Sequence, residues 1–169
     1  MDDPVTMLEA VIEIPKGTRN KYEYDHERGV IFLDRRLFSA TYYPTDYGFL
    51  PGTLAEDGDP LDVLVILDEP AFPGCHVMVR PVGVFWMSDE SGRDAKILAV
   101  PAHDGPAGGI WDLDELAPHL TDEIEHFFKV YKDLEPSKHS DVFGFGDARD
   151  AATEIRRSIE RAAATSPGS

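Results

Sequence analysis

The sequence predicts a mainly β protein with α-helices, in the form of a small β-barrel with helices packed outside it. In the first two thirds of the chain, short alternating or continuous apolar stretches are separated by turns that contain glycine and proline. In the last third, apolar residues recur at helical spacing. Short strands followed by helices favour a barrel with peripheral helices. With 169 residues, 42% of them hydrophobic, we expect a single domain over residues 1–169.

The first strand is predicted at Leu8–Ile14, where apolar residues occupy every second position. Residues 21–25 and 30–34 flank a short loop that ends in Gly29, and this pattern predicts a hairpin. Further strands are predicted at 63–67, 77–87 and 97–100. Pro81 has no N–H to donate, so it should interrupt the second of these strands or place it at a sheet edge.

Two helices are predicted near the C-terminal end. Thr121 is expected to cap the first, with Asp122 and Glu123 in its first turn. One apolar face of this helix is formed by Ile124, Phe127, Phe128 and Tyr131. The second helix should begin near Asp147, and its apolar stripe is formed by Ala151, Ala152, Ile155, Ile159 and Ala162. Residues 164–169 are expected to be frayed.

Composition excludes several classes of function. The net charge of −16 argues against nucleic acid as a partner, because phosphate backbones require a basic surface. No apolar run approaches the roughly 20 residues of a membrane span, and the acidic start does not resemble a signal peptide. Cys75 is the only cysteine, which favours a reducing compartment. We therefore expect a cytoplasmic protein without a membrane partner.

The most informative stretch is EDGDPLD at residues 56–62, which places Asp57, Asp59 and Asp62 within one turn before a strand. Like charges this close repel one another unless a cation lies between them, and Mg²⁺ prefers such hard oxygen ligands. An ordinary solvated acidic turn is the competing interpretation. An EF-hand is excluded, because the sixth position counted from Asp57 is Asp62 where that loop requires glycine.

A second acidic cluster lies at residues 89–96, with Asp89, Glu90 and Asp94 followed by Lys96. Taken alone it is a polar hairpin tip. If strand alternation holds, Asp94 and Lys96 point to the same side. An anion and a cation presented together suit a site that handles both metal and phosphate.

Weaker signals come from three other regions. Glu13, Lys21, Glu23 and Arg35 lie on the first predicted strands, where charged residues are the ordinary outer face of an antiparallel sheet. Tyr43 and Tyr47 are expected in the core or at its rim, although a phenol can donate to a phosphate oxygen. Tyr131 and Lys132 end the first predicted helix, where a lysine suits the helix dipole.

This inventory fits metal-assisted transfer of a phosphoryl group to water. Metals neutralise phosphates and acidify water, while arginine and lysine stabilise charge on the departing group. No G-x-S-x-G, P-loop or HExxH motif is present, which leaves serine, nucleotide and zinc chemistry unsupported. His26 and His103 still have room near the mouth of such a site. The rival hypothesis is a barrel that binds divalent cations or a phosphorylated ligand without turnover.

Four segments resemble the soluble family I inorganic pyrophosphatases, of the bacterial, actinobacterial type. They are IEIPKGTRNKYEYD, YPTDYGFLPGTLAEDGDPLDVLV, RPVGVFWMSDESGRDAKILAVP and HFFKVYKDLEP. The resemblance runs in order from about Val11 to about Pro136. It implies a five-stranded OB-like β-barrel with two main peripheral helices, and hydrolysis of pyrophosphate to two orthophosphates. It also implies Mg²⁺ as cofactor with Mn²⁺ as an alternative, direct transfer to water without a covalent intermediate, and a homo-oligomer, expected to be a hexamer.

The resemblance also assigns roles to residues. Asp59 would orient or deprotonate the water, although schemes differ on whether Asp59 or Asp94 accepts the proton. The metal ligands would be Glu13, Glu23, Asp57, Asp62, Asp89 and Asp94. The phosphates would be bound by Lys21, Arg35, Tyr47, Tyr131 and Lys132, with support from Tyr43 and Lys96.

The chain departs from the family pattern at residues 103–111, at residues 138–150 and at Arg36. We expect none of these departures to touch the assigned ligands. They are expected to alter contacts between subunits instead.

Overall fold

The computed structural model describes residue 5 and residues 7–103 and 109–166. The strands are β1 (Leu8–Ile14), β2 (Asn20–Asp25), β3 (Val30–Arg36), β4 (Asp46–Phe49), β5 (Asp62–Val65), β6 (His76–Asp89), β7 (Gly92–Pro101) and β8 (Ser140–Gly146). The helices are the 3-10 helix η1 (Leu113–Glu115) and the α-helices α1 (Pro118–Val130) and α2 (Ala148–Thr165).

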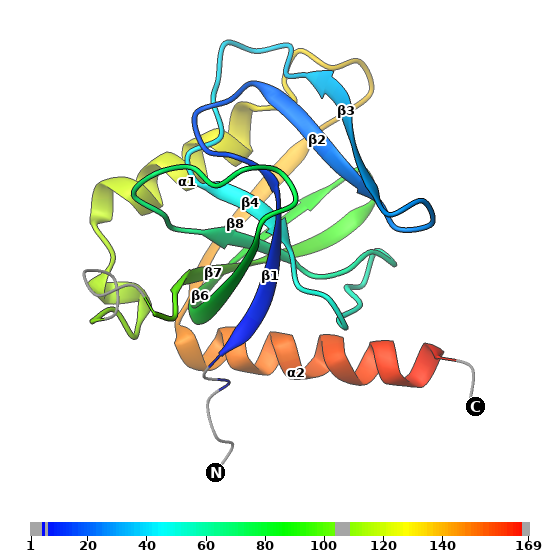
Figure 1. Cartoon of the computed structure of the whole chain (residues 1–169). Helices are drawn as coiled ribbons and strands as arrows, with labels where there is room; N and C mark the ends of the chain where they lie inside the picture. The colour runs from blue at the N-terminus through cyan, green and yellow to red at the C-terminus, as the bar shows by residue number, and fades with distance from the viewer. Residues whose placement is uncertain (1–4, 6, 104–108, 167–169) are drawn as a thin grey trace.

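Five strands close into a ring (Figure 1). Hydrogen-bonded neighbours follow the order β1, β4, β5, β7 and β6, and β6 pairs back with β1. The β5–β7 pair is parallel, whereas the other pairs of the ring are antiparallel. β8 extends the sheet from β6, and β2 and β3 form a separate hairpin. The predicted OB-like barrel with two peripheral helices is confirmed.

The predicted strand at Leu8–Ile14 and the hairpin closed at Gly29 are both present, as β1 and as β2 with β3. Gly29 has a φ of 66°, the left-handed conformation that glycine adopts without strain. Two strands, β4 and β8, were not predicted. In β4 a side chain is excluded at Gly48, because a Cβ there would lie 1.9 Å from the carbonyl oxygen of Val11 on β1. Glycine in a strand thus marks the close approach of two backbones.

β6 continues through Pro81, so the predicted interruption is wrong, but the alternative prediction of an edge position holds locally on one side of the strand. β6 pairs with β7 along its length, with a register shift between Pro81 and Gly83. On its other side β6 pairs with β1 as far as Val79 and with β8 from Val84. Pro81 lies between these two partners, at a position where neither ladder takes a hydrogen bond from it.

Two buried clusters lie on opposite faces of the central strands. The cluster with Ile12, Val63 and Ile97 includes Ile155 of α2. The cluster with Leu64 and Leu98 instead includes residues of α1. Successive residues of β5 and β7 alternate between the two clusters, as strand geometry requires. Figure 1 shows α2 crossing beneath the barrel, with α1 and the β2–β3 hairpin towards the opposite end.

The predicted start of the first helix is wrong. α1 begins at Pro118, and Ala117 precedes it without a side-chain cap, so Thr121 lies inside the helix and donates to the carbonyl of Pro118. Proline at the first helical position needs no hydrogen-bond acceptor for its nitrogen. The apolar face is confirmed, because Ile124, Phe127, Phe128 and Tyr131 are all buried.

The second helix begins as predicted. Asp147 caps α2, and its carboxylate and that of Asp150 accept reciprocal backbone bonds in a capping box. Ala151, Ala152 and Ile155 are buried, but Ile159 is 42% exposed and Ser158 takes its place in the buried stripe. Of the end predicted to fray, Ala164 and Thr165 are helical, and residues 167–169 lie outside the described part of the chain. Neither described α-helix is long and apolar enough to span a membrane.

Candidate active site

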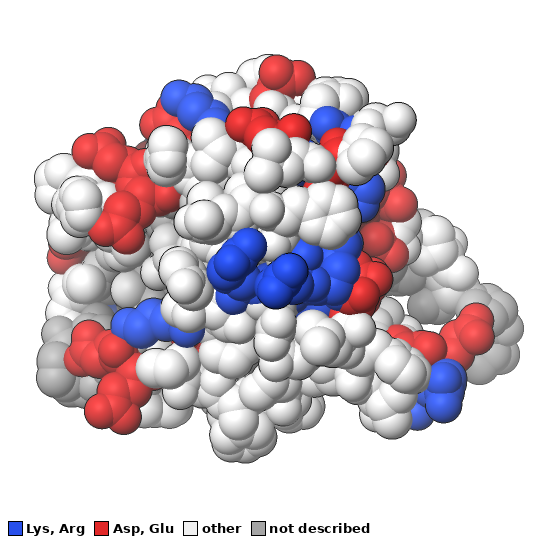
Figure 2. Space-filling view, turned by 90° about the horizontal axis from the view of Figure 1, so that it is seen from above, with Lys and Arg blue, Asp and Glu red and all other residues white. Residues whose placement is uncertain are grey.

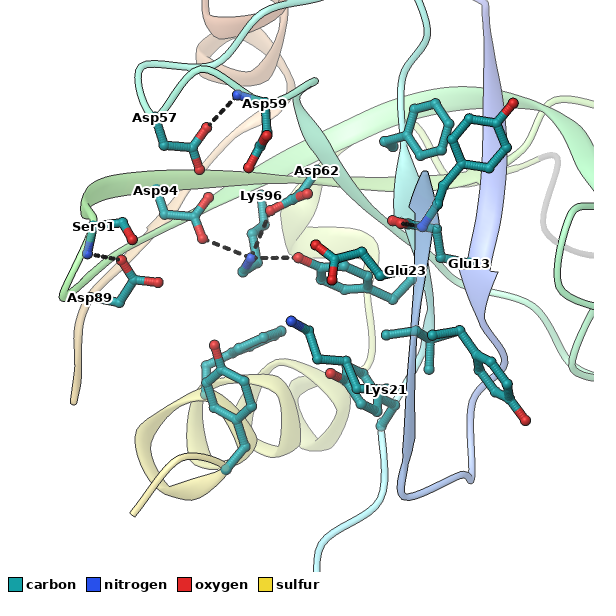
Figure 3. Close-up of a pocket in the computed structure, with 18 of the residues that line it drawn as sticks. Glu13, Lys21, Glu23, Asp57, Asp59, Asp62, Asp89, Ser91, Asp94 and Lys96 are labelled. Atoms are coloured by element: carbon teal, nitrogen blue, oxygen red, sulfur yellow. Dashed lines mark hydrogen bonds and ion pairs between the residues drawn. The ribbon is translucent and has the colours of Figure 1, made fainter. Parts of the chain in front are cut away.

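One cavity of about 300 Å³ is lined by every residue that the sequence singled out for catalysis, metal binding or phosphate binding. Figure 3 shows the aspartates on one side of this cavity, with Lys96 at its floor and Lys21 pointing in from the hairpin. Residues far apart in the sequence meet here because the cavity lies where β1, β4, β5 and β7 face the hairpin and the end of α1. The convergence is an observation, whereas the roles of the residues remain predictions.

The parallel pairing of β5 with β7 places the central acid–base group. Asp62 and Lys96 are direct partners in the register, and Asp94 lies two residues before Lys96 on the same face of β7. Lys96 Nζ donates to Asp62 Oδ2 at 2.9 Å and to Asp94 Oδ2 at 2.8 Å. The predicted same-side placement of Asp94 and Lys96 is confirmed. Lys96 therefore lies between two carboxylates that would otherwise repel each other.

Lys96 is only 2% exposed, and its charge is retained because of these partners. Burial acts to lower the pKa of Lys96, but Asp62 and Asp94 outweigh burial and hold this pKa well above its ordinary value. Burial raises the pKa of Asp94, with Lys96 opposing and Asp62 adding to the rise. A third bond, 2.8 Å long, runs from Lys96 Nζ to the hydroxyl of Tyr47. The ammonium group of Lys96 therefore donates three hydrogen bonds, to Asp62, Asp94 and Tyr47.

The turn that precedes β5 presents Asp57 and Asp59 above this group (Figure 3). Asp59 N donates to Asp57 Oδ1 at 3.0 Å, and Gly58 between them has a φ of 93°. Burial is the main cause that raises the pKa of Asp57, and the charges of Asp94 and Asp59 raise it further. The carboxylates of Asp57, Asp59 and Asp94 are thus close enough for their negative charges to repel one another.

A second lysine-centred group lies at the tip of the β6–β7 hairpin. Lys132 Nζ lies 3.0 Å from Asp89 Oδ2 and 3.1 Å from Glu90 Oε1. Burial acts to raise the pKa of Asp89, but the bonds from Lys132 and from the backbone of Ser91 outweigh it, so the pKa is lowered. Lys132 follows Tyr131, the C-cap of α1, so the end of this helix closes the cavity on the side of Asp89.

The wall formed by β1 and the hairpin contributes Glu13, Lys21 and Glu23. Glu13 Oε2 accepts a 2.8 Å bond from the backbone N–H of Tyr24. Burial is the largest cause that raises the pKa of Glu13 to about 7, with smaller contributions from the charges of Asp62 and Glu23. This carboxylate is therefore in a position where a cation would be favourable.

Arg35 enters the cavity from the end of β3. Its Nε lies 2.6 Å from Glu135 Oε1, and its NH1 lies 2.5 Å from Asp34 Oδ2. Burial acts to lower the pKa of Arg35, but Glu135 and Asp34 raise it. Figure 2, seen from above Figure 1, shows a compact group of lysine and arginine side chains near the middle of this face, with acidic side chains around it. A strongly acidic protein thus has a local site for an anion.

Two tyrosines of the cavity wall, Tyr43 and Tyr131, are buried, and Tyr47 lies beside them. Tyr43 is 3% and Tyr131 is 7% exposed, and the Tyr47 ring packs against Tyr43 at a centroid distance of 5.8 Å. Burial raises the pKa values of Tyr43, Tyr47 and Tyr131, so all three are neutral and able to donate a hydrogen bond at pH 7.

The donor set fits Mg²⁺ in chemical kind, because it consists of carboxylate oxygens whose mutual repulsion a divalent cation would relieve. Among residues 7–103 and 109–166, no three acidic, histidine or cysteine side chains already converge as a group that could hold a metal ion. The carboxylates instead surround the cavity, and two of them accept bonds from Lys96. Such a spread suits Mg²⁺, which keeps several of its waters.

Sequence analysis did not select every residue of the cavity. Lys138, Glu90 and Ser91 also line it. Of the two histidines placed near the mouth of the site from the sequence, His26 lines the cavity and His103 does not. We expected the 138–150 segment to touch none of the assigned ligands, and this is wrong, because β8 within that segment pairs with β6 up to Asp89. The predicted hairpin tip at residues 89–96 was the signal in the sequence for Glu90 and Ser91, whereas no pattern in the sequence indicated Lys138.

The model of the inorganic pyrophosphatase family matches residues 10–163 of this chain. An inorganic pyrophosphatase from Leifsonia xyli subsp. xyli is 56% identical over 147 residues, which cover 87% of this chain and 90% of that protein. One from Streptomyces coelicolor is 54% identical over 154 residues, which cover 91% of this chain and 94% of that protein.

Solved structures agree with these relatives. The crystal structure of an inorganic pyrophosphatase from Thermus thermophilus has a TM-score of 0.92 at 46% sequence identity. The match covers 96% of this chain and 95% of that one. The similarity therefore extends over the barrel, the hairpin and both helices.

Proposed function

The chain belongs to the inorganic pyrophosphatase family and is an inorganic diphosphatase, and we propose that it hydrolyses pyrophosphate by direct attack of water, with several Mg²⁺ ions and no covalent intermediate. The observation that supports this mechanism best is the single cavity, in which carboxylates of β1, β2, the 57–62 turn and the 89–94 hairpin meet cationic side chains of β2, β3, β7 and the segment after α1. Carboxylates alone would bind a metal, and cations alone would bind an anion. Their combination suits a metal–pyrophosphate complex.

Asp57, Asp62 and Asp94 would hold the activating ions, and Asp89 with Asp94 would hold an ion that enters with the substrate. Glu13 and Glu23 would hold a further ion from the hairpin side. The chemistry that bound Mg²⁺ supplies is neutralisation of phosphate charge and a lower pKa for water. Mn²⁺ is the alternative ion for the same oxygen ligands.

Asp59 is the residue that we propose as proton acceptor. Asp62 and Asp94 already accept bonds from Lys96, and Asp57 accepts one from the backbone of Asp59. Among the described residues, none donates a hydrogen bond to the carboxylate of Asp59, which is exposed to the cavity. Asp59 is therefore the aspartate of this group that is available to take a proton from water.

Cationic and phenolic groups would bind the two phosphates. Lys21 and Arg35 enter from the hairpin, and Lys132 enters after the end of α1 beside Asp89. Tyr47 accepts from Lys96 and can donate its own proton to a phosphate oxygen, with Tyr43 and Tyr131 beside it. These groups would stabilise negative charge on the departing phosphate.

Phosphate release from magnesium pyrophosphate tests the function. The wild-type protein should release two phosphates per pyrophosphate, whereas a protein that only binds cations or phosphate would release none. Asp59→Asn should lower kcat by about 10²- to 10⁴-fold, because general-base catalysis is worth that much. Its circular dichroism should match wild type. Nearly full activity of Asp59→Asn would remove this residue as the proton acceptor.

Direct transfer to water has a separate test. After acid quenching during turnover of ³²P-labelled pyrophosphate, we expect no label on the protein. Acid-stable labelled protein would contradict direct transfer and favour a phosphoenzyme.

Three further expectations belong to the same proposal. We propose that residues 1–169 act as one domain, that the protein is cytoplasmic and that it forms a homo-oligomer, with a hexamer expected from the family resemblance. Sedimentation equilibrium would test the assembly, since a monomer would exclude it. Neither a nucleic acid nor a membrane is proposed as a partner.

A further inference from the structure

Helix α2 lies outside the cavity, yet it is hydrogen-bonded to Leu54, which precedes the turn that carries Asp57 and Asp59. The backbone N–H of Leu54 donates to the carbonyl of Ser158 at 3.0 Å. Arg161 Nε donates to the carbonyl of Leu54 at 2.8 Å. Both polar groups of one backbone residue are therefore bound by α2, and we call this pair of bonds the Leu54 clasp.

The helix side of the clasp is itself fixed. Ser158 is fully buried. Arg161 NH2 donates to Ser158 Oγ at 3.2 Å and lies 3.5 Å from Glu154 Oε1. The rigid guanidinium is thus oriented by neighbours on its own helix, and this fixes the direction in which Nε–H points.

Short backbone bonds connect the clasp to the two carboxylates. Ala55, next to Leu54, donates to the carbonyl of Asp59 at 2.7 Å, and Gly58 donates to the carbonyl of Ala55 at 3.2 Å. The bond from Asp59 N to Asp57 Oδ1 completes the turn. A shift of Leu54 would therefore move Asp57 and Asp59 together.

We infer that Arg161 is a positioning residue, which sets the placement of the Asp57 and Asp59 carboxylates through the Leu54 clasp. The inference rests on the proposed function, in that these carboxylates serve Mg²⁺ and water. The plain alternative is that Arg161 makes a surface ion pair with Glu154 and only stabilises α2. Removing one positive charge would by itself favour cation binding, whereas loss of positioning would weaken it, so the two effects have opposite signs.

The test is Mg²⁺ binding without substrate, measured by isothermal titration calorimetry. Arg161→Ala should raise the Kd for Mg²⁺ by about 3- to 10-fold and lower kcat by a similar factor, because a bond that orients ligands is lost. The matched control is Arg157→Ala, which removes the same charge from an exposed position one turn earlier on α2. Its Kd should equal the wild-type value or fall slightly. Hydrogen exchange at Leu54 and Ala55 should accelerate only in Arg161→Ala.

If Arg161→Ala binds Mg²⁺ as tightly as wild type and only its Tm falls, Arg161 merely stabilises the helix and the inference is wrong. Should the alanine variant not fold, Arg161→Lys gives the same decision, because lysine keeps the charge but cannot donate from two guanidinium nitrogens. Its Kd should lie above wild type, and an unchanged Kd would overturn the inference. Failure of the proposed function is separate, since it would appear as wild-type protein that releases no phosphate.

Discussion

Two lysine-centred groups line the same cavity, and their carboxylates behave in opposite ways. Around Lys96, which is 2% exposed, burial dominates and the pKa of Asp94 is raised. Around Lys132, hydrogen bonds outweigh burial, and the pKa of Asp89 is lowered. Both lysines contact two carboxylates at similar distances. The opposite pKa shifts of Asp94 and Asp89 therefore come from the deeper burial of Asp94 and from the negative charges of other acids near it.

This contrast predicts different roles for the two groups, in binding of a cation and in binding of the substrate. In the Lys96 group, two carboxylates contact one lysine in a poorly solvated place, where burial raises the pKa of Asp94. Binding of a further cation is therefore more favourable here. The Lys132 group has the same ratio of one lysine to two carboxylates, but Glu90 is 31% exposed and the pKa of Asp89 is lowered. This more solvated group suits binding and release of a substrate that brings its own ion. Substitutions at the two lysines should separate these roles.

The largest effect is expected for Lys96→Met. Breaking a buried ion pair by removing one partner costs about 3–5 kcal/mol. This range applies because the Lys96 side chain is only 3% exposed, and Asp62 and Asp94 would face each other without their cation. The free energy of unfolding, measured with urea in EDTA at pH 7, should fall by this amount. The loss should become smaller as the pH is lowered, because burial and the charge of Asp62 raise the pKa of Asp94 and its protonation relieves the repulsion. A loss below 1 kcal/mol would show that the deep group is not strained by its charges.

A smaller effect is expected for Asp57→Ala, which removes one carboxylate above the Lys96 group. The Mg²⁺ concentration for half-maximal activity should rise by about tenfold or more. A titration of activity against Mg²⁺ at saturating pyrophosphate measures this value. An unchanged Mg²⁺ requirement would remove Asp57 from the metal ligands. It would also count against the claim that the buried carboxylates around Lys96 favour binding of a further cation.

Lys132→Met should reduce the free energy of unfolding by about 1 kcal/mol, because its carboxylate partners are partly solvated. Its KM for magnesium pyrophosphate should nevertheless rise, since a phosphate-binding cation is lost. Urea denaturation and steady-state kinetics check the two parts. A stability loss equal to that of Lys96→Met would erase the proposed difference between the groups.

The smallest effect is expected for Glu90→Gln, at under about 0.5 kcal/mol at pH 7. Burial acts to raise the pKa of Glu90, but backbone and Lys132 bonds outweigh it and lower the pKa. A lowered pKa means that this stabilisation is complete above the unfolded value near pH 4.3 and is lost as pH falls through the folded value. Wild type and variant should thus converge in stability on acidification. Divergence at low pH would contradict this sign.

Local patterns predicted the parts of the fold and site that depend on neighbouring residues. Alternation placed Asp94 beside Lys96, and Gly29 located the hairpin. The start of α1 was misjudged because threonine is a frequent cap, whereas Pro118 begins the helix without one. The family resemblance, and not spacing, supplied the roles of individual residues.

Long-range geometry could not be read from the sequence. The parallel register that sets Asp62 opposite Lys96 joins strands that are separated by all of β6. The contact of Lys132 with Asp89 depends on how α1 packs against the barrel. Likewise, β8 and Lys138 reach the site through pairing with β6, which no local pattern in the 138–150 segment indicates.

The most direct test of the account is a crystal structure of the protein soaked in Mn²⁺, with the ions located by anomalous scattering. We expect ions within the described cavity, coordinated by oxygens of Asp57, Asp62 and Asp94, with Asp59 next to a water. Ions bound elsewhere, with Asp62 and Asp94 still paired to Lys96 and Asp57 free of metal, would contradict it.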